Sequence, residues 1–196
     1  RMALHFYQGG LGLPDRDYYF DADSRAKMLR AEYVTHVGKM FELLGDAPAR
    51  AATEAATVMA LETELAGASR KLEDLRDPHK NYNAMTLDSL AKLTPSIRWR
   101  AFLAEGDIRG VDSVIVGQPE FYRQLEKTLT SRPLADLKAY LRWQLVNTYA
   151  SEAGGKFDRQ NFHFYGTVMN GTTVERPRWK RMLDEGRYGS VSELAA

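Results

Sequence analysis

The chain has 196 residues, 44% of them hydrophobic and 27% charged, which indicates a globular protein long enough to bury a core. Its 27 basic and 26 acidic residues leave a formal net charge of +1, so the composition favours neither nucleic acid nor an anionic membrane surface as a partner. Cysteine is absent, which excludes disulfides, thiolate metal ligands and a cysteine nucleophile within this chain.

Two long helices are predicted in the first third of the chain. Ser24 is expected to cap a helix that runs to about Leu44, because apolar residues recur on one face and Gly45 follows as a stop signal. A short connection through Pro48 leads to a second helix over about residues 49–69. A short link between two long helices predicts an antiparallel hairpin.

Glu62 interrupts the apolar stripe of the second predicted helix. A buried carboxylate needs a charged partner or several hydrogen bonds, so a buried structural ion pair is one interpretation. A helix-edge position, with the carboxylate reaching water, is another. A catalytic role is the third, and no neighbouring zinc motif or second acid supports it.

Shorter elements are predicted in the middle of the chain. Asp77 and Pro78 indicate a turn, and Thr86 is expected to cap a short helix. Pro95 can occupy the first turn of a further helix. The side chains expected to point inward from that helix are Trp99, Phe102 and Leu103.

The second half of the chain is predicted to be mostly helical. Residues 112–117 (DSVIVG) form the one convincing strand-like run, and helices are expected to begin at Pro119 and at Pro133. Residues 161–169 and a stretch from Thr172 that carries Trp179 and Leu183 complete the pattern. The inward face expected for the helix after Pro133 comprises Leu137, Tyr140, Leu141, Leu145 and either Val146 or Tyr149. The sequence therefore predicts an all-α, multi-helix domain with at most one short strand pair.

Catalytic motifs are absent from the sequence. The four histidines, His5, His36, His79 and His163, form no HExxH motif and no i, i+4 pair, so a zinc site would have to be assembled from scattered residues. His163 is expected to be packed or at the surface, and His79 to be exposed in a polar turn. No GxSxG elbow, Walker loop, dinucleotide fingerprint or calcium loop is present.

Two segments could suggest phosphate binding. Gly9, Gly10 and Gly12 match neither phosphate motif, because no Lys-Ser/Thr follows and no strand clearly precedes them. The basic run RPRWKR (residues 176–181) fits the end of an amphipathic helix better than a phosphate site. No stretch reaches the roughly 20 apolar residues of a membrane span, and the start RMALHFYQ lacks the features of a signal peptide.

Several motifs, in order, resemble those of the neprilysin and endothelin-converting-enzyme family of zinc metallopeptidases, which includes bacterial oligopeptidases. They are QGGLGLPDRDYYF (residues 8–20), VMALETELAGAS (58–69), RDPHKNYNAMTLDSL (76–90), Trp99 with Phe102 and Leu103, and NFHFYGTVMNGTTVERPRWKR (161–181). The resemblance covers nearly the whole chain.

The resemblance implies a role in proteolysis for a larger enzyme. Such enzymes have a thermolysin-like lobe, in which two His of HExxH and a further Glu bind zinc, and a helical cap lobe that limits access to peptides of modest size. Residues 1–196 correspond to the cap lobe, and the catalytic lobe is absent, so the chain is interpreted as a fragment that is inactive alone. Zinc is expected in the parent enzyme and not on this chain, and no catalytic or metal residue is assigned. The substrate-binding residues stay unidentified.

The expected partners are the catalytic lobe of the same polypeptide and peptide substrates, with no nucleic acid and no membrane contact from this segment. The resemblance favours a periplasmic, secreted or membrane-anchored parent, with a cytoplasmic one as the alternative. A stand-alone helical interaction module without peptidase activity is the alternative function. Residues 9–20 are expected to be ordered and partly buried, with Arg16 tying the segment down, and an apolar face is expected to be exposed.

Overall fold

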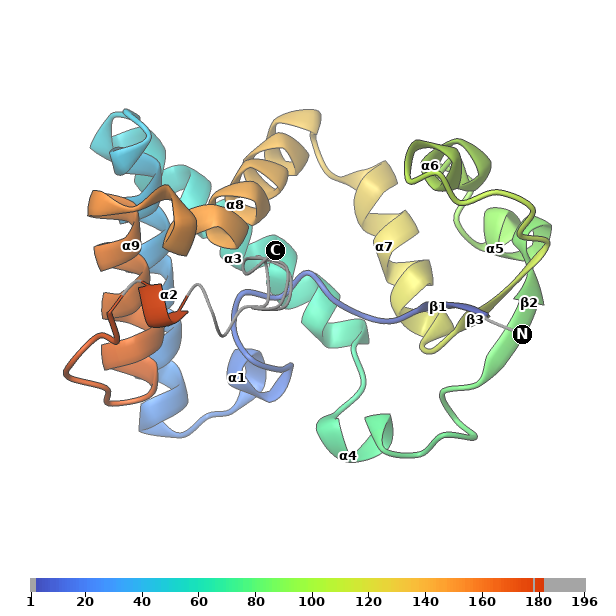
Figure 1. Cartoon of the computed structure of the whole chain (residues 1–196), viewed down its shortest axis with the longest axis horizontal. Coiled ribbons are helices and arrows are strands. Elements are labelled where there is room, and N and C mark those ends of the chain that lie inside the picture. Colours follow the sequence, from blue (N-terminus) through green and yellow to red (C-terminus); the bar gives the residue numbers. More distant parts are fainter. Residues whose placement is uncertain (1–2, 178, 182–196) are drawn as a thin grey trace, which may run out of the picture.

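The computed structural model describes residues 3–177 and 179–181, and helices dominate them (Figure 1), which confirms the all-α class. The elements in chain order are β1 (Leu4–Phe6), α1 (Asp17–Phe20), α2 (Ser24–Leu43), α3 (Pro48–Ala68), α4 (Leu72–Leu75), β2 (Asn83–Thr86), α5 (Leu87–Leu93), α6 (Trp99–Glu105), β3 (Ser113–Val116), α7 (Pro119–Ser131), α8 (Leu134–Ala153), α9 (Gly155–Asn161) and the π-helix η1 (Phe162–Met169).

The predicted helical hairpin is formed by α2 and α3, which pack against each other along their length. The cap of α2 is Asp23, whose side chain accepts a hydrogen bond from the Ala26 amide at 2.9 Å; Ser24, the predicted cap, is the first helical residue. An aspartate and a serine stand side by side there, and both are good cap residues, so the sequence alone does not choose between them. Gly45 follows α2 with a φ of 99°, as expected of a glycine after a helix end.

The sheet has three strands, in the order β1-β3-β2, rather than the single pair expected. β1 runs parallel to β3, with Leu4 opposite Val114, and β2 runs antiparallel to it, with Asn83 opposite Val116. β1 is only three residues long, too short for alternation to identify it. A strand therefore does precede the opening glycines, contrary to the prediction, although no Lys-Ser/Thr follows them.

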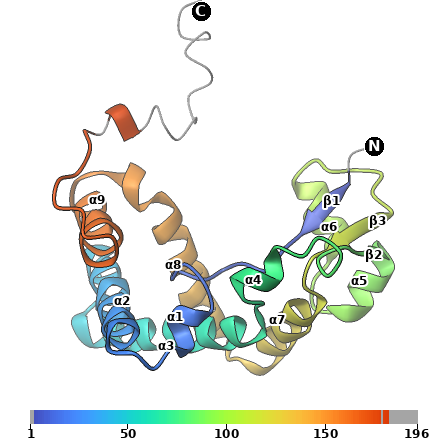
Figure 2. The same ribbon diagram turned by 90° about the horizontal axis from the view of Figure 1, so that it is seen from below.

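Two hydrophobic cores lie on either side of α3. The first gathers buried side chains from α2, α3, α8 and η1, and the second gathers those of the sheet with α5, α6 and α7. α3 supplies Ala55 and Val58 to the first core, and Leu61 and Leu65 to the second. Figure 2 shows the resulting U-shaped outline, in which α2 and α9 lie in one arm, the sheet with α5 and α6 lies in the other, and α3 and α7 lie between them.

The face that α8 buries differs in part from the prediction: Leu137, Tyr140 and Val146 pack against the cores as expected, but Leu141 and Leu145 do not. Trp143, Ala139 and Ala150 are buried, whereas Leu141 and Leu145 are 65% and 62% exposed. α8 carries large apolar residues on both faces, so hydrophobic periodicity cannot identify which face meets the core. The exposed face, called the α8 stripe below, consists of Leu134, Leu141, Leu145 and Tyr149.

Three local predictions in the remaining chain also need correction. α6 begins at Trp99, because Pro95 lies in a turn before it, and Phe102 is 59% exposed rather than inward. Residues 171–177 are not helical, and a helical turn appears only at 179–181. Leu183 lies outside the described residues. The cap of α5 and the start of α7 are as predicted: Thr86 accepts a hydrogen bond from the Ser89 amide, and Pro119 is the first residue of α7.

Candidate functional site

Residues 7–13, called the connecting segment below, join β1 in one arm to α1 near the other (Figure 2). Side chains, rather than neighbouring strands, form many of the hydrogen bonds to their main-chain groups. The side-chain hydrogen bonds to the segment's main chain run from Tyr122 Oη to Tyr7 O (3.0 Å), from Gln8 N to Gln118 Oε1 (2.8 Å), from Tyr140 Oη and Gln144 Nε2 to Gly10 O (2.7 and 3.2 Å), from Gly12 N to Glu62 Oε2 (3.2 Å), from Tyr165 Oη to Gly12 O (3.0 Å) and from Leu13 N to Tyr19 Oη (3.1 Å). The segment is thus held in place by both arms.

Two glycines of the connecting segment are required by close approach. Gly10 has a φ of 77°, and an added Cβ would overlap the hydroxyl of Tyr140. At Gly12 an added Cβ would overlap the Tyr33 hydroxyl. Gly9 differs from both, because nothing lies within 4 Å of the position its Cβ would take.

Glu62 lies beneath the connecting segment and is fully buried, with an exposed fraction of 0%. Its carboxylate accepts hydrogen bonds from Tyr19 Oη at 2.7 Å, from Tyr33 Oη at 2.8 Å and from the Gly12 amide. No ion pair joins it to a cation in the described part of the chain, so both the edge position and the structural ion pair are wrong. Several neutral donors satisfy this carboxylate instead.

Burial raises the pKa of Glu62 from its ordinary 4.5 to about 7, outweighing the hydrogen bonds from Tyr19, Tyr33 and Gly12, which lower it. The same burial, with the nearby Glu62 charge, raises the pKa of the Tyr19 and Tyr33 hydroxyls above their usual range. A shifted carboxyl often marks a catalytic acid or base, but this one is sealed from solvent and from any substrate. Its role is to anchor the connecting segment to α3.

The residues that follow the connecting segment, up to Phe20, are held in place by contacts with α3 and with one another. Arg16 donates to the carbonyl of Ala66 at 3.3 Å and lies 3.7 Å from the Asp17 carboxylate, and the Asp15 carboxylate accepts from the Asp17 amide. Leu13 and Tyr19 are buried. The partly buried segment predicted from the sequence is therefore present.

An apolar concavity of about 370 Å³, called the aromatic groove below, lies beside the connecting segment. Trp99, 6% exposed, lies deep in it, and Tyr7 and Phe102, 58% and 59% exposed, stand at its rim. Its lining comprises Phe6, Tyr7, Gly9, Gly10, Leu65, Ile97, Trp99, Phe102, Phe121, Tyr122, Leu125 and Tyr140. No charged side chain is among them, so the groove suits an uncharged, apolar group.

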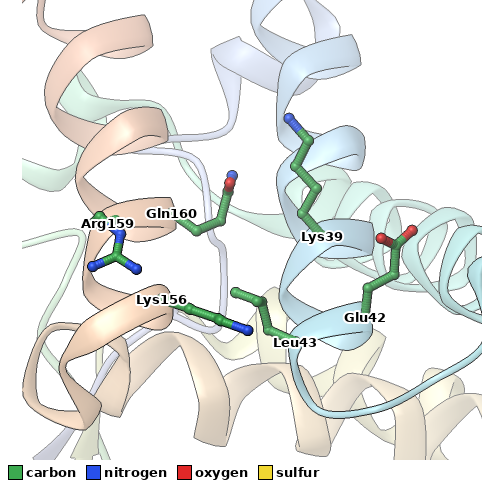
Figure 3. Close-up of a pocket in the computed structure, with 6 residues that line it drawn as sticks. All are labelled: Lys39, Glu42, Leu43, Lys156, Arg159 and Gln160. Atoms are coloured by element: carbon green, nitrogen blue, oxygen red, sulfur yellow. The ribbon is translucent and has the colours of Figure 1, made fainter.

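A second concavity, of about 490 Å³, lies between α2 and α9 and is shown in Figure 3. It is lined by the exposed side chains of Lys39, Glu42, Lys156 and Arg159 and by the half-buried Leu43 and Gln160. In Figure 3 the ammonium of Lys156 extends toward Leu43, whereas the Glu42 carboxylate points away from α9. Exposed charged side chains around an open depression are typical of a solvated surface.

The histidines do not come together. His5 stacks on Tyr7, His36 is buried against Phe164 with its ring centroid 4.8 Å away, and His79 and His163 are exposed. Burial, with the like charges of His163 and Lys39, lowers the pKa of His36 to about 3, so its ring is neutral at pH 7. Within residues 3–177 and 179–181, no three His, Asp or Glu side chains are grouped so as to hold a metal ion.

The basic run at residues 176–181 is only partly described, since Arg178 lies outside the described residues. Arg181 donates to both carboxylate oxygens of Asp158 at 2.8 Å and pairs with Glu175 at 2.9 Å. Its guanidinium is therefore engaged by protein carboxylates rather than presented to a phosphate.

Comparison with known structures places this fold among zinc metalloproteases. Zinc metalloprotease Zmp1 of Mycobacterium tuberculosis, in its open state, superposes with a TM-score of 0.84 at 29% identity, over 93% of this chain and 28% of that chain. The same protein in complex with an inhibitor gives the same values.

The sequence comparisons specify the family. The profile of the N-terminal part of peptidase family M13 matches residues 1–189, and the chain therefore belongs to peptidase family M13. It is 28% identical to endothelin-converting enzyme 1 of Cavia porcellus over 92% of the chain and 24% of that protein. It is 36% identical to an endothelin-converting enzyme homolog of Locusta migratoria over 74% and 21%, and 29% identical to neprilysin of Mus musculus over 91% and 26%. The chain thus spans about a quarter of the length of these relatives, and the neprilysin-like resemblance read from its motifs is confirmed.

Proposed function

We propose that the chain is the non-catalytic helical lobe of a zinc-dependent metalloendopeptidase that cleaves oligopeptides, and that this lobe encloses the active-site cavity and limits substrate size. The match of residues 1–189 to the N-terminal part of peptidase family M13 carries the proposal. The sequence contains no HExxH motif, so zinc and the catalytic groups would belong to another part of the polypeptide.

Two surface features support a lobe that faces another part of the same protein. The α8 stripe presents four large apolar side chains that are each more than half exposed: Leu134, Leu141, Leu145 and Tyr149. The aromatic groove is a second apolar surface. Such surfaces mark contacts with a partner, here the catalytic lobe or a confined peptide.

A peptidase assay on two chains tests the proposal. The purified 196-residue chain, with and without added zinc, is expected to leave an internally quenched oligopeptide intact. The polypeptide encoded by the native reading frame is expected to contain HExxH beyond residue 196, to hydrolyse the peptide, and to lose activity on chelation. Hydrolysis by the 196-residue chain that survives chelation would contradict the proposal.

A stand-alone helical interaction module is the second candidate, and the same exposed apolar surfaces support it. A native stop codon directly after Ala196 would favour this module, whereas a downstream HExxH favours the lobe.

We propose a periplasmic, secreted or membrane-anchored location for the parent enzyme, from its family. In the described part of the chain no helix has the length and apolar character to cross a membrane. Cell fractionation with an antibody against this segment tests the location.

A further inference from the structure

We propose that the aromatic groove and the adjoining Gly9–Gly10 backbone form a binding site for an extended peptide that carries an aromatic or large aliphatic side chain. The proposal rests on the proposed function in one respect, that a peptidase lobe meets peptides. The proposed function requires only that the lobe limits the size of the substrate. A peptide-binding site would be an additional property of the lobe.

The groove supplies the pocket for a side chain. Its volume of about 370 Å³ is at the lower end of ligand pockets, which span roughly 300–1,000 Å³, so it suits one or two side chains rather than a large cofactor. Trp99 forms tilted or edge contacts with Phe6, Phe102 and Tyr122, with ring centroids 4.9 to 6.1 Å apart. An entering aromatic ring would extend this packing in the same geometry.

The connecting segment supplies main-chain groups beside that pocket. The amides of Gly9 and Gly10 donate no hydrogen bond to any group in residues 3–177 or 179–181, although Tyr140 satisfies the carbonyl of Gly10. β1, directly before this segment, is an edge strand of the described sheet, with β3 on its one paired side. Unpaired main chain next to an apolar pocket is the arrangement by which sheet edges bind extended peptides.

The absence of charge from the groove lining decides the chemistry of the ligand. A nucleotide, a phosphate or an acidic peptide would lose its hydration without gaining a cationic partner there. A peptide main chain with an apolar side chain can satisfy both parts of the site, since its carbonyl groups accept from amides and its side chain fills the groove.

Two variants test the site without disturbing the fold. Gly9→Val adds a side chain where nothing lies within 4 Å of the Cβ position, so it obstructs the peptide path and leaves protein contacts intact. Phe102→Ala removes a rim ring that is 59% exposed, so its cost in stability is small. Leu145→Ala is the matched control, because Leu145 is exposed to a similar extent, 62%, but lies outside the groove.

Binding is measured by isothermal titration of the 196-residue chain with acetyl-Ser-Ala-Phe-Ala-Ser-amide. Binding is expected for the unaltered chain and Leu145→Ala, and is expected to weaken at least tenfold in Gly9→Val and Phe102→Ala, with unchanged circular dichroism. Two altered peptides test the side chain and the main chain separately: one has Ser in place of Phe, and in the other the carbonyl groups flanking Phe are replaced by methylene groups, which cannot accept from the Gly9 and Gly10 amides. Each should also bind at least tenfold more weakly.

Three results would overturn the proposal. The first is that the unaltered chain does not bind at millimolar peptide, and the second is that both groove variants still bind as tightly as the unaltered chain. The third is that a second copy of the chain occupies the groove, which would be seen as self-association that Phe102→Ala abolishes. The titration requires neither zinc nor hydrolysis. Failure to bind would therefore leave the proposed lobe function standing, and an inactive full-length polypeptide would leave the binding result standing.

Discussion

Glu62→Gln tests how a buried carboxyl without a counter-charge affects the stability of this domain. In the folded protein Glu62 is fully buried, and its pKa is raised from 4.5 to about 7. The folded state therefore holds the Glu62 proton more tightly than the unfolded state does. This contribution to stability is fully present below pH 4.5 and is lost as the pH rises through about 7.

The size of the effect follows from the two pKa values. Each tenfold change in proton affinity is worth ~1.4 kcal/mol, so a rise from 4.5 to about 7 corresponds to about 3 kcal/mol of unfolding free energy. That is a large share of the roughly 5–15 kcal/mol by which domains are stable. Glutamine cannot ionise, so the variant lacks this pH dependence, although its amide donors impose a constant cost beside Tyr19 and Tyr33.

Urea denaturation at a series of pH values between 4.5 and 8.5 measures the effect. The unfolding free energy of the unaltered chain minus that of Glu62→Gln is expected to fall by about 3 kcal/mol across this range. Glu42→Gln, at an exposed position on α2, is the control for removing one carboxylate from the surface. A constant Glu62 difference, or one that rises with pH, would refute the reasoning, because the donors would then outweigh burial.

Three further predictions concern single positions. Gly12→Ala should lower the unfolding free energy by roughly 1–3 kcal/mol, because its Cβ overlaps the Tyr33 hydroxyl. Gly9→Ala should change the unfolding free energy by less than about 0.5 kcal/mol in the same urea experiment. Equal costs for the two variants would contradict the packing at Gly12. Thr86→Ala removes the side-chain cap of α5 and should cost about 1 kcal/mol, and an unchanged midpoint would argue against that cap. Leu145→Lys, on the α8 stripe, should leave stability within about 0.5 kcal/mol of the unaltered chain and reduce any self-association seen by sedimentation; a large loss of stability would place Leu145 in the core instead.

Local sequence signals were sufficient for the elements whose ends and faces are set by nearby residues. The period of apolar residues and the stop at Gly45 place α2, the β-branched run at residues 114–116 marks β3, and Thr86 caps α5 as predicted. These features depend on capping, turns and periodicity, which act over a few residues. The ordered motif around Gly9–Phe20 also identified the family.

The sequence alone therefore determined a helical domain, the approximate order of its elements and its membership of a peptidase family. Only the tertiary structure decided which face of α8 is buried, because both faces are apolar and the choice depends on what α3 presents. It also decided the partners of Glu62, since Tyr19, Tyr33 and Gly12 come from three separate segments. The aromatic groove has the same origin: its walls come from β1, α3, α6, α7 and α8, and contacts between residues far apart in the chain leave no periodic signal in the sequence.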